Sequence, residues 1–194
     1  MQQNNTKEAN LLLNSLLLTD RWLPGYLFNK KFDQYLFFDA DLTSVDELII
    51  AIKDIVISRI TPSPHMAVFS YTDKAFITWM MAEDDWVLKM DSIYKSLRES
   101  RDYNGLVLAD VSMKFIAHQP NPVSMGVFAF SSDNGKDENW RNISDNVRGC
   151  FFDLTDVETW LSGGSERDLS LTDSMGREYL ESLMANYAKN SGET

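Results

Sequence analysis

Every second residue is apolar along the segment from Val107 to Ala117. A period of two residues is typical of a β-strand that turns one face to a core and the other to solvent. We therefore expect one long, half-buried strand here, with His118 exposed on its polar face or donating a hydrogen bond at a hairpin end. The apolar positions are Val107, Ala109, Val111, Met113, Phe115 and Ala117.

Other segments show either this strand pattern or the three-and-four spacing of a core-facing helix. Strands and helices follow one another without a regular βαβ rhythm, which predicts an α+β fold. We expect residues 1–194 to form a single domain, a mainly antiparallel sheet of five or six strands packed by four or five helices, with residues 1–7 and 189–194 disordered. The expected strands are 35–40, 66–71, 75–80, 107–117, 123–130 and 150–152, and the expected helices are 11–18, 44–60, 83–100, 155–161 and 173–187.

Two capping boxes mark expected helix starts, Ser44 to Glu47 and Thr155 to Glu158. Gly163 is expected to stop the second of these helices. In the helix that starts at Ser44, Ile50 and Ile57 widen the apolar stripe, so we expect that helix to be covered on more than one side.

The formal charge of the chain is -11, and residues 131–194 carry thirteen acidic and six basic residues. A negative exterior repels phosphate backbones and anionic membrane surfaces, so we expect neither nucleic acid nor a membrane as partner. A basic protein partner would be attracted, and its association would be accelerated.

Residues suited to metal binding or nucleophilic chemistry are sparse. Cys150 is the only cysteine, and we expect it to be a buried strand residue rather than a nucleophile. With His65 and His118 far from it in sequence, we expect no metal site, and no nucleotide-binding or hydrolase motif is present to suggest a cofactor. The apolar run Leu11–Leu18 is shorter than the roughly 20 residues that span a bilayer, and its flanks do not resemble a secretory signal. We expect a cytoplasmic location.

The segment from Ser131 to Glu158 is the candidate binding surface, because acidic residues surround a lone tryptophan there. Tryptophan is common in binding hot spots, and acidic neighbours would select a basic partner. The alternative is a solvated loop whose Trp140 packs back onto the domain. The candidate residues are Asp133, Asp137, Glu138, Trp140, Asp145, Asp153, Asp156 and Glu158.

These observations favour a non-catalytic, acidic protein-binding protein. Its most concrete version is a bacterial immunity protein that binds a basic, nuclease-type toxin domain and blocks its active site. Two alternatives stay open: a secretion or folding chaperone, and an enzyme with a cleft of carboxylates. The sequence does not indicate the oligomeric state.

Overall fold

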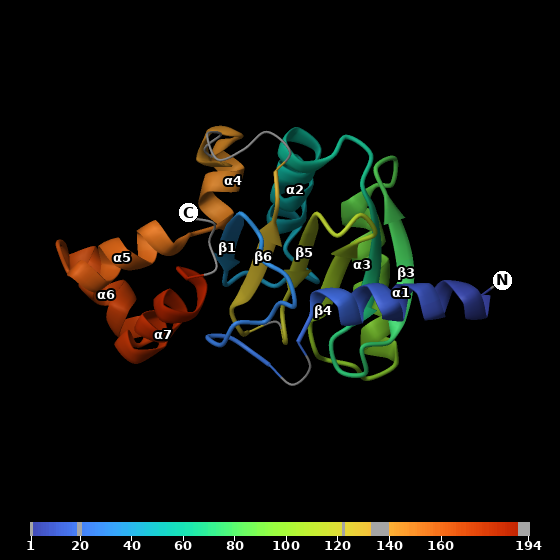
Figure 1. Ribbon diagram of the computed structural model, residues 1–194, viewed down its shortest axis with the longest axis horizontal. Coiled ribbons are helices and arrows are strands. Elements are labelled where there is room, and N and C mark those ends of the chain that lie inside the picture. Colours follow the sequence, from blue (N-terminus) through green and yellow to red (C-terminus); the bar gives the residue numbers. More distant parts are fainter. Residues whose placement is uncertain (1, 19–20, 122, 133–139, 190–194) are drawn as a thin grey trace.

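The computed structural model describes residues 2–18, 21–121, 123–132 and 140–189 (Figure 1). One six-stranded sheet has the order β1-β6-β5-β4-β2-β3, and every neighbouring pair is antiparallel. The fold is therefore α+β, as the sequence predicts, although the described part of the chain contains seven α-helices rather than four or five. The strands are β1 (Gln34–Phe38), β2 (His65–Ser70), β3 (Phe76–Met81), β4 (Leu106–Asp110), β5 (Phe115–His118) and β6 (Gly126–Phe130).

The expected long strand at 107–117 is wrong, because the chain turns back in its middle and forms the hairpin of β4 and β5. Asp110 makes the turn: its carboxylate accepts hydrogen bonds from the Ser112 hydroxyl and from the Lys114 amide. Met113 adopts a positive φ of 59°. The alternation of apolar and polar residues continues across this turn, so the sequence pattern alone could not reveal the turn. As a consequence His118 is buried, with 2% of its surface exposed, and not on a solvent face.

Helix α2 (Asp46–Ile55) begins where it is expected, but not through a capping box. Its N-cap is Val45, which makes no side-chain capping hydrogen bond. The Ser44 hydroxyl instead donates to Asp41, which also accepts from the Thr43 amide. The helix continues as the π-helical turn η1 (Val56–Ile60).

Helix α5 (Leu154–Ser162) does start with a capping box, two residues earlier than expected. The Asp153 carboxylate accepts from the backbone of Thr155 and Asp156, and the Asp156 carboxylate accepts from the Asp153 amide. Gly163 ends the helix in the left-handed conformation, as expected.

The carboxy-terminal helix expected at 173–187 is two helices, α6 (Glu166–Met175) and α7 (Arg177–Tyr187), which are separated by Gly176. Cys150 is a half-buried residue at the end of helix α4 (Asp145–Cys150), not a strand residue. Only Phe152 joins the sheet edge, through two backbone hydrogen bonds of 2.8 and 3.0 Å with Phe37.

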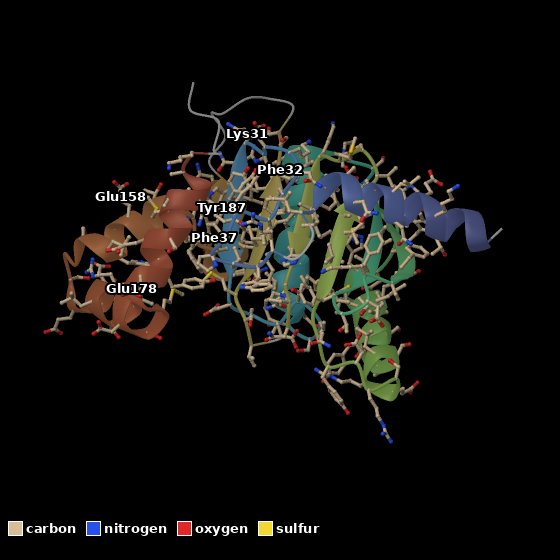
Figure 2. The ribbon with its side chains drawn as sticks, turned by 60° about the horizontal axis from the view of Figure 1, so that its bottom comes forward. Lys31, Phe32, Phe37, Glu158, Glu178 and Tyr187 are labelled. Atoms are coloured by element: carbon tan, nitrogen blue, oxygen red, sulfur yellow. The ribbon has the colours of Figure 1, made fainter. Side chains whose placement is uncertain are left out.

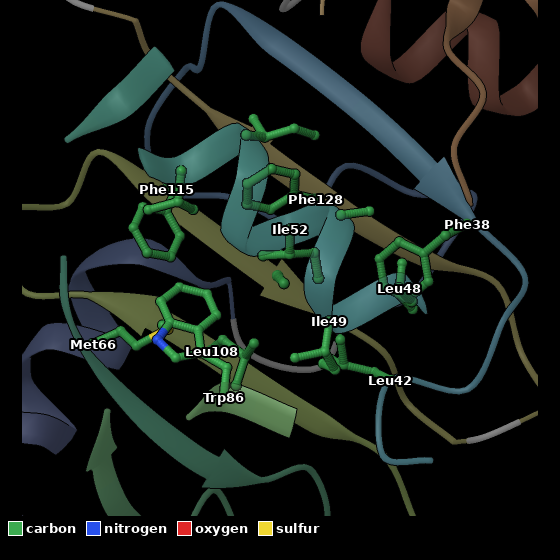
Figure 3. Close-up of a cluster of buried hydrophobic side chains, with 14 of the residues drawn as sticks. Phe38, Leu42, Leu48, Ile49, Ile52, Met66, Trp86, Leu108, Phe115 and Phe128 are labelled. Carbon is green, nitrogen blue, oxygen red and sulfur yellow. The ribbon is translucent and has the colours of Figure 1, made fainter. Parts of the chain in front are cut away.

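One face of the sheet is covered by α2, η1, α3 (Trp86–Glu99) and α4, with the short turn η2 (Trp140–Asn142) beside them. The apolar stripes of α2 and α3 meet alternate side chains of the strands, and the close-up in Figure 3 shows Trp86 and Ile52 among them. Full burial of such side chains contributes about 1.5–3 kcal/mol each.

The opposite face is covered by α1 (Gln2–Leu16), the segment 21–32 and α7. Tyr187 of α7 anchors this layer: its ring centroid lies 5.1 Å from that of Tyr35 and 5.2 Å from that of Phe37, and its hydroxyl donates to the Gly25 carbonyl at 3.2 Å (Figure 2). Helices α5, α6 and α7 together lie beyond the β1 edge (Figure 1).

At the amino terminus, α1 begins at Gln2, inside the segment 1–7 that we expected to be disordered. At the other end, Lys189 lies in a turn, and the rest of the tail expected to be disordered lies outside the described residues. In the described ranges, no helix is both long and apolar enough to span a bilayer.

Candidate functional site

Trp140, the centre of the predicted binding segment, packs back onto the domain. Only 4% of its surface is exposed, and its indole contacts Phe151 edge to face at a centroid distance of 6.3 Å. The indole N–H donates to Asp153 Oδ2 at 3.2 Å. The structure therefore agrees with the alternative of a tucked-in tryptophan, and Trp140 is not available on the surface.

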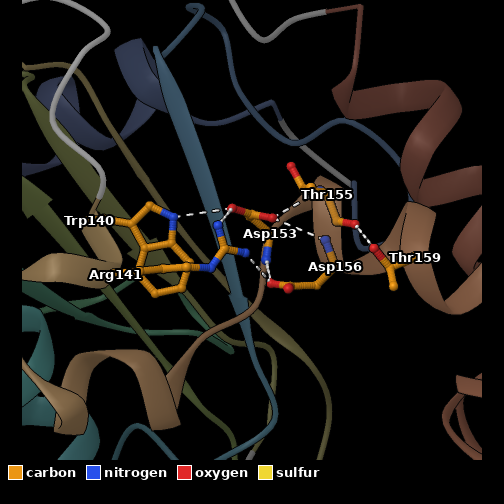
Figure 4. A network of polar contacts seen from close by, with 6 residues as sticks. All are labelled: Trp140, Arg141, Asp153, Thr155, Asp156 and Thr159. Carbon is orange, nitrogen blue, oxygen red and sulfur yellow. Dashed lines mark hydrogen bonds and ion pairs between the residues drawn. The ribbon is translucent and has the colours of Figure 1, made fainter. Parts of the chain in front are cut away.

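Two of the predicted acidic residues are bound by a neighbouring arginine (Figure 4). Arg141 contacts Asp153 Oδ2 at 2.8 Å and Asp156 Oδ2 at 2.6 Å, and its guanidinium lies 4.6 Å from the Trp140 ring centroid. Burial opposes the charge of the guanidinium, but the hydrogen bonds and charges of both aspartates outweigh burial and raise the pKa of Arg141. Asp153 and Asp156 therefore cap α5 and hold Arg141, which cancels part of their charge.

The other members of the predicted set are not gathered into one patch. Asp145 has 97% of its side chain exposed and lies 3.5 Å from Arg148, and Glu158 is exposed on α5. Asp133, Asp137 and Glu138 lie outside the described residues. The segment 131–158 as a whole thus contributes two exposed carboxylates to the described surface, from different helices.

A second surface, which sequence reasoning did not single out, lies between α2 and the start of α3. Two hollows of about 260 and 330 Å³ open there, and both are lined by Ile49 and Val87. They are neighbours on one surface, because they share these two lining residues. We call their lining the α2–α3 face: Thr43, Ser44, Val45, Asp46, Ile49, Ile50, Lys53, Glu83, Asp84, Asp85, Trp86, Val87, Leu88, Met90, Asp91 and Tyr94.

The α2–α3 face is strongly acidic. Its lining holds five acidic residues, Asp46, Glu83, Asp84, Asp85 and Asp91, and one basic residue, Lys53. Lys89 neutralises Asp84 at 2.7 Å, and Lys95 of α3 lies 2.6 Å from Asp91. The hydrogen bonds of Lys89 and of the Met81 amide lower the pKa of Asp84.

Apolar side chains stay exposed between these carboxylates. The exposed fractions are 44% for Ile50 and 64% for Leu88, and Ile57 of η1, outside the face, is 40% exposed. The sequence pattern predicts that other parts of the protein cover this side of α2. In the described part of the chain, this side stays exposed to solvent. An apolar floor with a charged rim is the usual anatomy of a protein interface.

A third feature, the sheet-end cleft, lies where β1, β2 and β5 end and β4 and β6 begin. Its volume is about 720 Å³. Segments far apart in sequence meet there because antiparallel strands bring alternate loops to one end of the sheet. The lining residues are Trp22, Leu23, Asp39, Tyr71, Asn104, Pro120, Asn121, Val123, Ser124, Met125, Ser174, Met175 and Tyr179.

Gln119, a fully buried side chain, fixes the walls of the sheet-end cleft. Its amide nitrogen donates to the carbonyls of Ala40, at 3.0 Å, and Ser124, at 2.9 Å, and its amide oxygen accepts from the Leu42 amide at 2.8 Å. Three hydrogen bonds on one buried amide tie the chain after β1 to the loop before β6. Gly105 permits the close approach on the other side, because a Cβ there would lie 2.1 Å from the Gln119 carbonyl oxygen.

Among the described residues that line the sheet-end cleft, Asp39 is the only charged one. Burial raises the pKa of Tyr179 to about 12 and also raises the pKa of Tyr71, so both phenols are neutral at physiological pH. Catalysis by a pair of carboxylates needs a second acid, which this lining does not supply.

Within the described ranges, no group of three or more His, Cys, Asp or Glu side chains is arranged to hold a metal ion. Burial raises the pKa of the Cys150 thiol, with Glu47 adding to the effect, which disfavours the thiolate that a nucleophile requires. In comparisons with known proteins, no family model, no curated protein and no solved structure matches this chain.

Proposed function

We propose that this chain is a non-catalytic, acidic protein that binds a basic protein partner through the α2–α3 face. The most concrete version is a bacterial immunity protein of the cytoplasm, which neutralises a nuclease-type toxin by covering its active site. This surface differs from the segment 131–158, in which the core and Arg141 hold Trp140, Asp153 and Asp156, and of which Asp133, Asp137 and Glu138 lie outside the described residues.

The observation that carries the proposal is the coincidence of charge and exposed apolar surface on two adjacent helices. The lining of the α2–α3 face holds five acids and one base, and Ile50 and Leu88 line the same two hollows with 44% and 64% of their surface exposed. The apolar side chains supply binding free energy when water is excluded, while the carboxylates select a partner of opposite charge.

A nuclease is a suitable partner because its active site must attract phosphates. Enzymes that act on nucleic acids carry clusters of lysine and arginine, since these residues neutralise the phosphate backbone. A negatively charged face that mimics the sign of the substrate would be steered into such a cleft.

The test is the affinity for the basic protein encoded next to this gene, measured by calorimetry with purified proteins. We expect Leu88→Ala to weaken binding by at least about tenfold, because it removes an exposed apolar side chain from the centre of the interface. Leu169→Ala is the matched control: Leu169 is 48% exposed on α6, away from the α2–α3 face, and its replacement should leave the affinity unchanged. Equal effects of the two substitutions, or no binding at all, would contradict the proposal.

The exposed apolar side chains of the α2–α3 face also suit a chaperone, which is the second candidate. A chaperone binds an unfolded segment of its client, whereas an immunity protein binds a folded domain. Affinity for the heat-unfolded partner that exceeds affinity for the folded partner would favour the chaperone.

A further inference from the structure

We propose that the sheet-end cleft is a binding site for a small organic cation, namely an alkylated ammonium with an apolar body. This inference concerns a different surface from the α2–α3 face and does not depend on a protein partner. Its volume of about 720 Å³ lies within the range of about 300–1,000 Å³ that is usual for small-molecule sites.

Aromatic side chains supply the attraction for a cation. Trp22, Tyr71 and Tyr179 all line the cleft, and the negative face of an aromatic ring attracts a positive charge, most strongly when the cation is weakly hydrated. One such contact is already formed beside the cleft, where Lys74 Nζ lies 3.7 Å from the Tyr71 ring centroid. An alkylated ammonium is more weakly hydrated than a lysine ammonium, and the other two lining rings, Trp22 and Tyr179, have no such contact with a described lysine or arginine.

The charge of the cleft has the required sign. Asp39 is exposed at the end of β1 and makes no ion pair or side-chain hydrogen bond with any described residue. Among the described lining residues none carries a positive charge, and the Lys74 ammonium lies beside the cleft, on the Tyr71 ring, rather than in the lining. An anionic ligand would meet an uncompensated carboxylate, whereas a cation would pair with it.

The apolar body of the ligand has its own contacts. Met125 and Met175 line the cleft, and methionine adapts to irregular apolar shapes. Tyr179 lies over Met125, with 3.6 Å between its hydroxyl and Met125 Sδ. Because Gln119 holds the walls together from the core, the site is largely formed before any ligand arrives, which lowers the entropic cost of binding.

The experiment compares two probes of nearly the same shape, choline and its neutral analogue 3,3-dimethylbutan-1-ol, by NMR titration of the full chain at constant ionic strength. We expect choline to bind saturably in the millimolar range or tighter, and the neutral analogue to bind at least about fivefold more weakly. Choline analogues that carry a benzyl group should bind more tightly than choline, because they fill more of the apolar wall.

Two variants assign the binding to this cleft. We expect Asp39→Asn and Trp22→Ala each to weaken choline binding at least about fivefold. Trp22 is 64% exposed, so its loss leaves no buried cavity. Asp46→Asn, on a different surface from the sheet-end cleft, is the matched control and should leave choline binding unchanged. Equal binding of the two probes, equal effects of Asp39→Asn and Asp46→Asn, or no saturable binding would overturn the proposal.

Discussion

His118 is a histidine that the fold keeps out of water. Its ring packs against Tyr71 at a centroid distance of 5.3 Å, and its Nδ1 has no hydrogen-bond partner among the described residues. Burial, together with the nearby charge of Lys74, lowers the pKa of His118 to about 3. The neutral imidazole is therefore the folded form at physiological pH, and a proton on it would be an uncompensated buried charge.

This burial makes the stability of the protein depend on pH between 7 and 5. The folded-state pKa of His118 lies below its unfolded value of about 6.5, so the unfolded chain binds the proton first and stability falls as the pH falls. We expect His118 to account for a loss of about 2 kcal/mol in the free energy of unfolding between pH 7 and pH 5. Urea unfolding of the wild type and of His118→Gln, at pH 7 and at pH 5, measures this loss in the free energy of unfolding. If the variant loses as much stability as the wild type over this range, His118 is not the cause.

Single residues were the hardest features to predict from sequence. Arg141 follows Trp140 and Gln119 follows His118 in the sequence, whereas burial comes from tertiary contacts such as those with Phe151 and Tyr71. The sequence shows that acidic residues surround Trp140 along the chain. It could not show that Arg141 binds two of them, Asp153 and Asp156.

At the level of elements, the period of apolar residues located the core-facing helices α2 and α3 and most of the strands. It failed where a turn left the period intact, as at Asp110 to Lys114, and where Gly176 divides α6 from α7. Both failures have one cause, since periodicity reports which side of an element is buried and not whether the backbone stays straight.

Two glycines in different elements should respond in opposite directions to replacement by alanine. A Cβ on Gly126 of β6 would lie 2.2 Å from the ring of Phe38, its cross-strand neighbour, which is fully buried. We expect Gly126→Ala to lower the free energy of unfolding by about 1–3 kcal/mol, since the ring cannot move without disturbing the core.

Gly149, in α4, provides the control. A Cβ there meets nothing within 4 Å, so we expect Gly149→Ala to stabilise the protein by about 0.5–1 kcal/mol through helix propensity. Urea denaturation of both variants measures the two effects. Stabilisation by Gly126→Ala would show that the packing of β6 on β1 is looser than described.

Across the whole molecule, the fold decides which acidic side chains lie together on the surface, and the order of residues along the chain does not show it. A count along the chain places the acidic excess in residues 131–194. The acidic residues of the α2–α3 face, however, come from Asp46 and from residues 83–91, which are remote in sequence and become neighbours when α2 packs beside α3. Ile50 was the one signal of this face in the sequence, because with Ile57 it widened the apolar stripe of the helix beyond what the core covers.

The central claim, that the α2–α3 face receives a basic protein, is tested most directly by association kinetics. The association rate constant with the neighbouring-gene partner is measured for the wild type, for Glu83→Lys and for the control Asp173→Lys, an equal charge change on the exposed surface of α6. We predict that Glu83→Lys slows association at least about fivefold at low salt, that Asp173→Lys has a much smaller effect, and that the difference shrinks at about 0.5 M NaCl. Equal slowing by both variants, or rates that do not depend on salt, would contradict the claim.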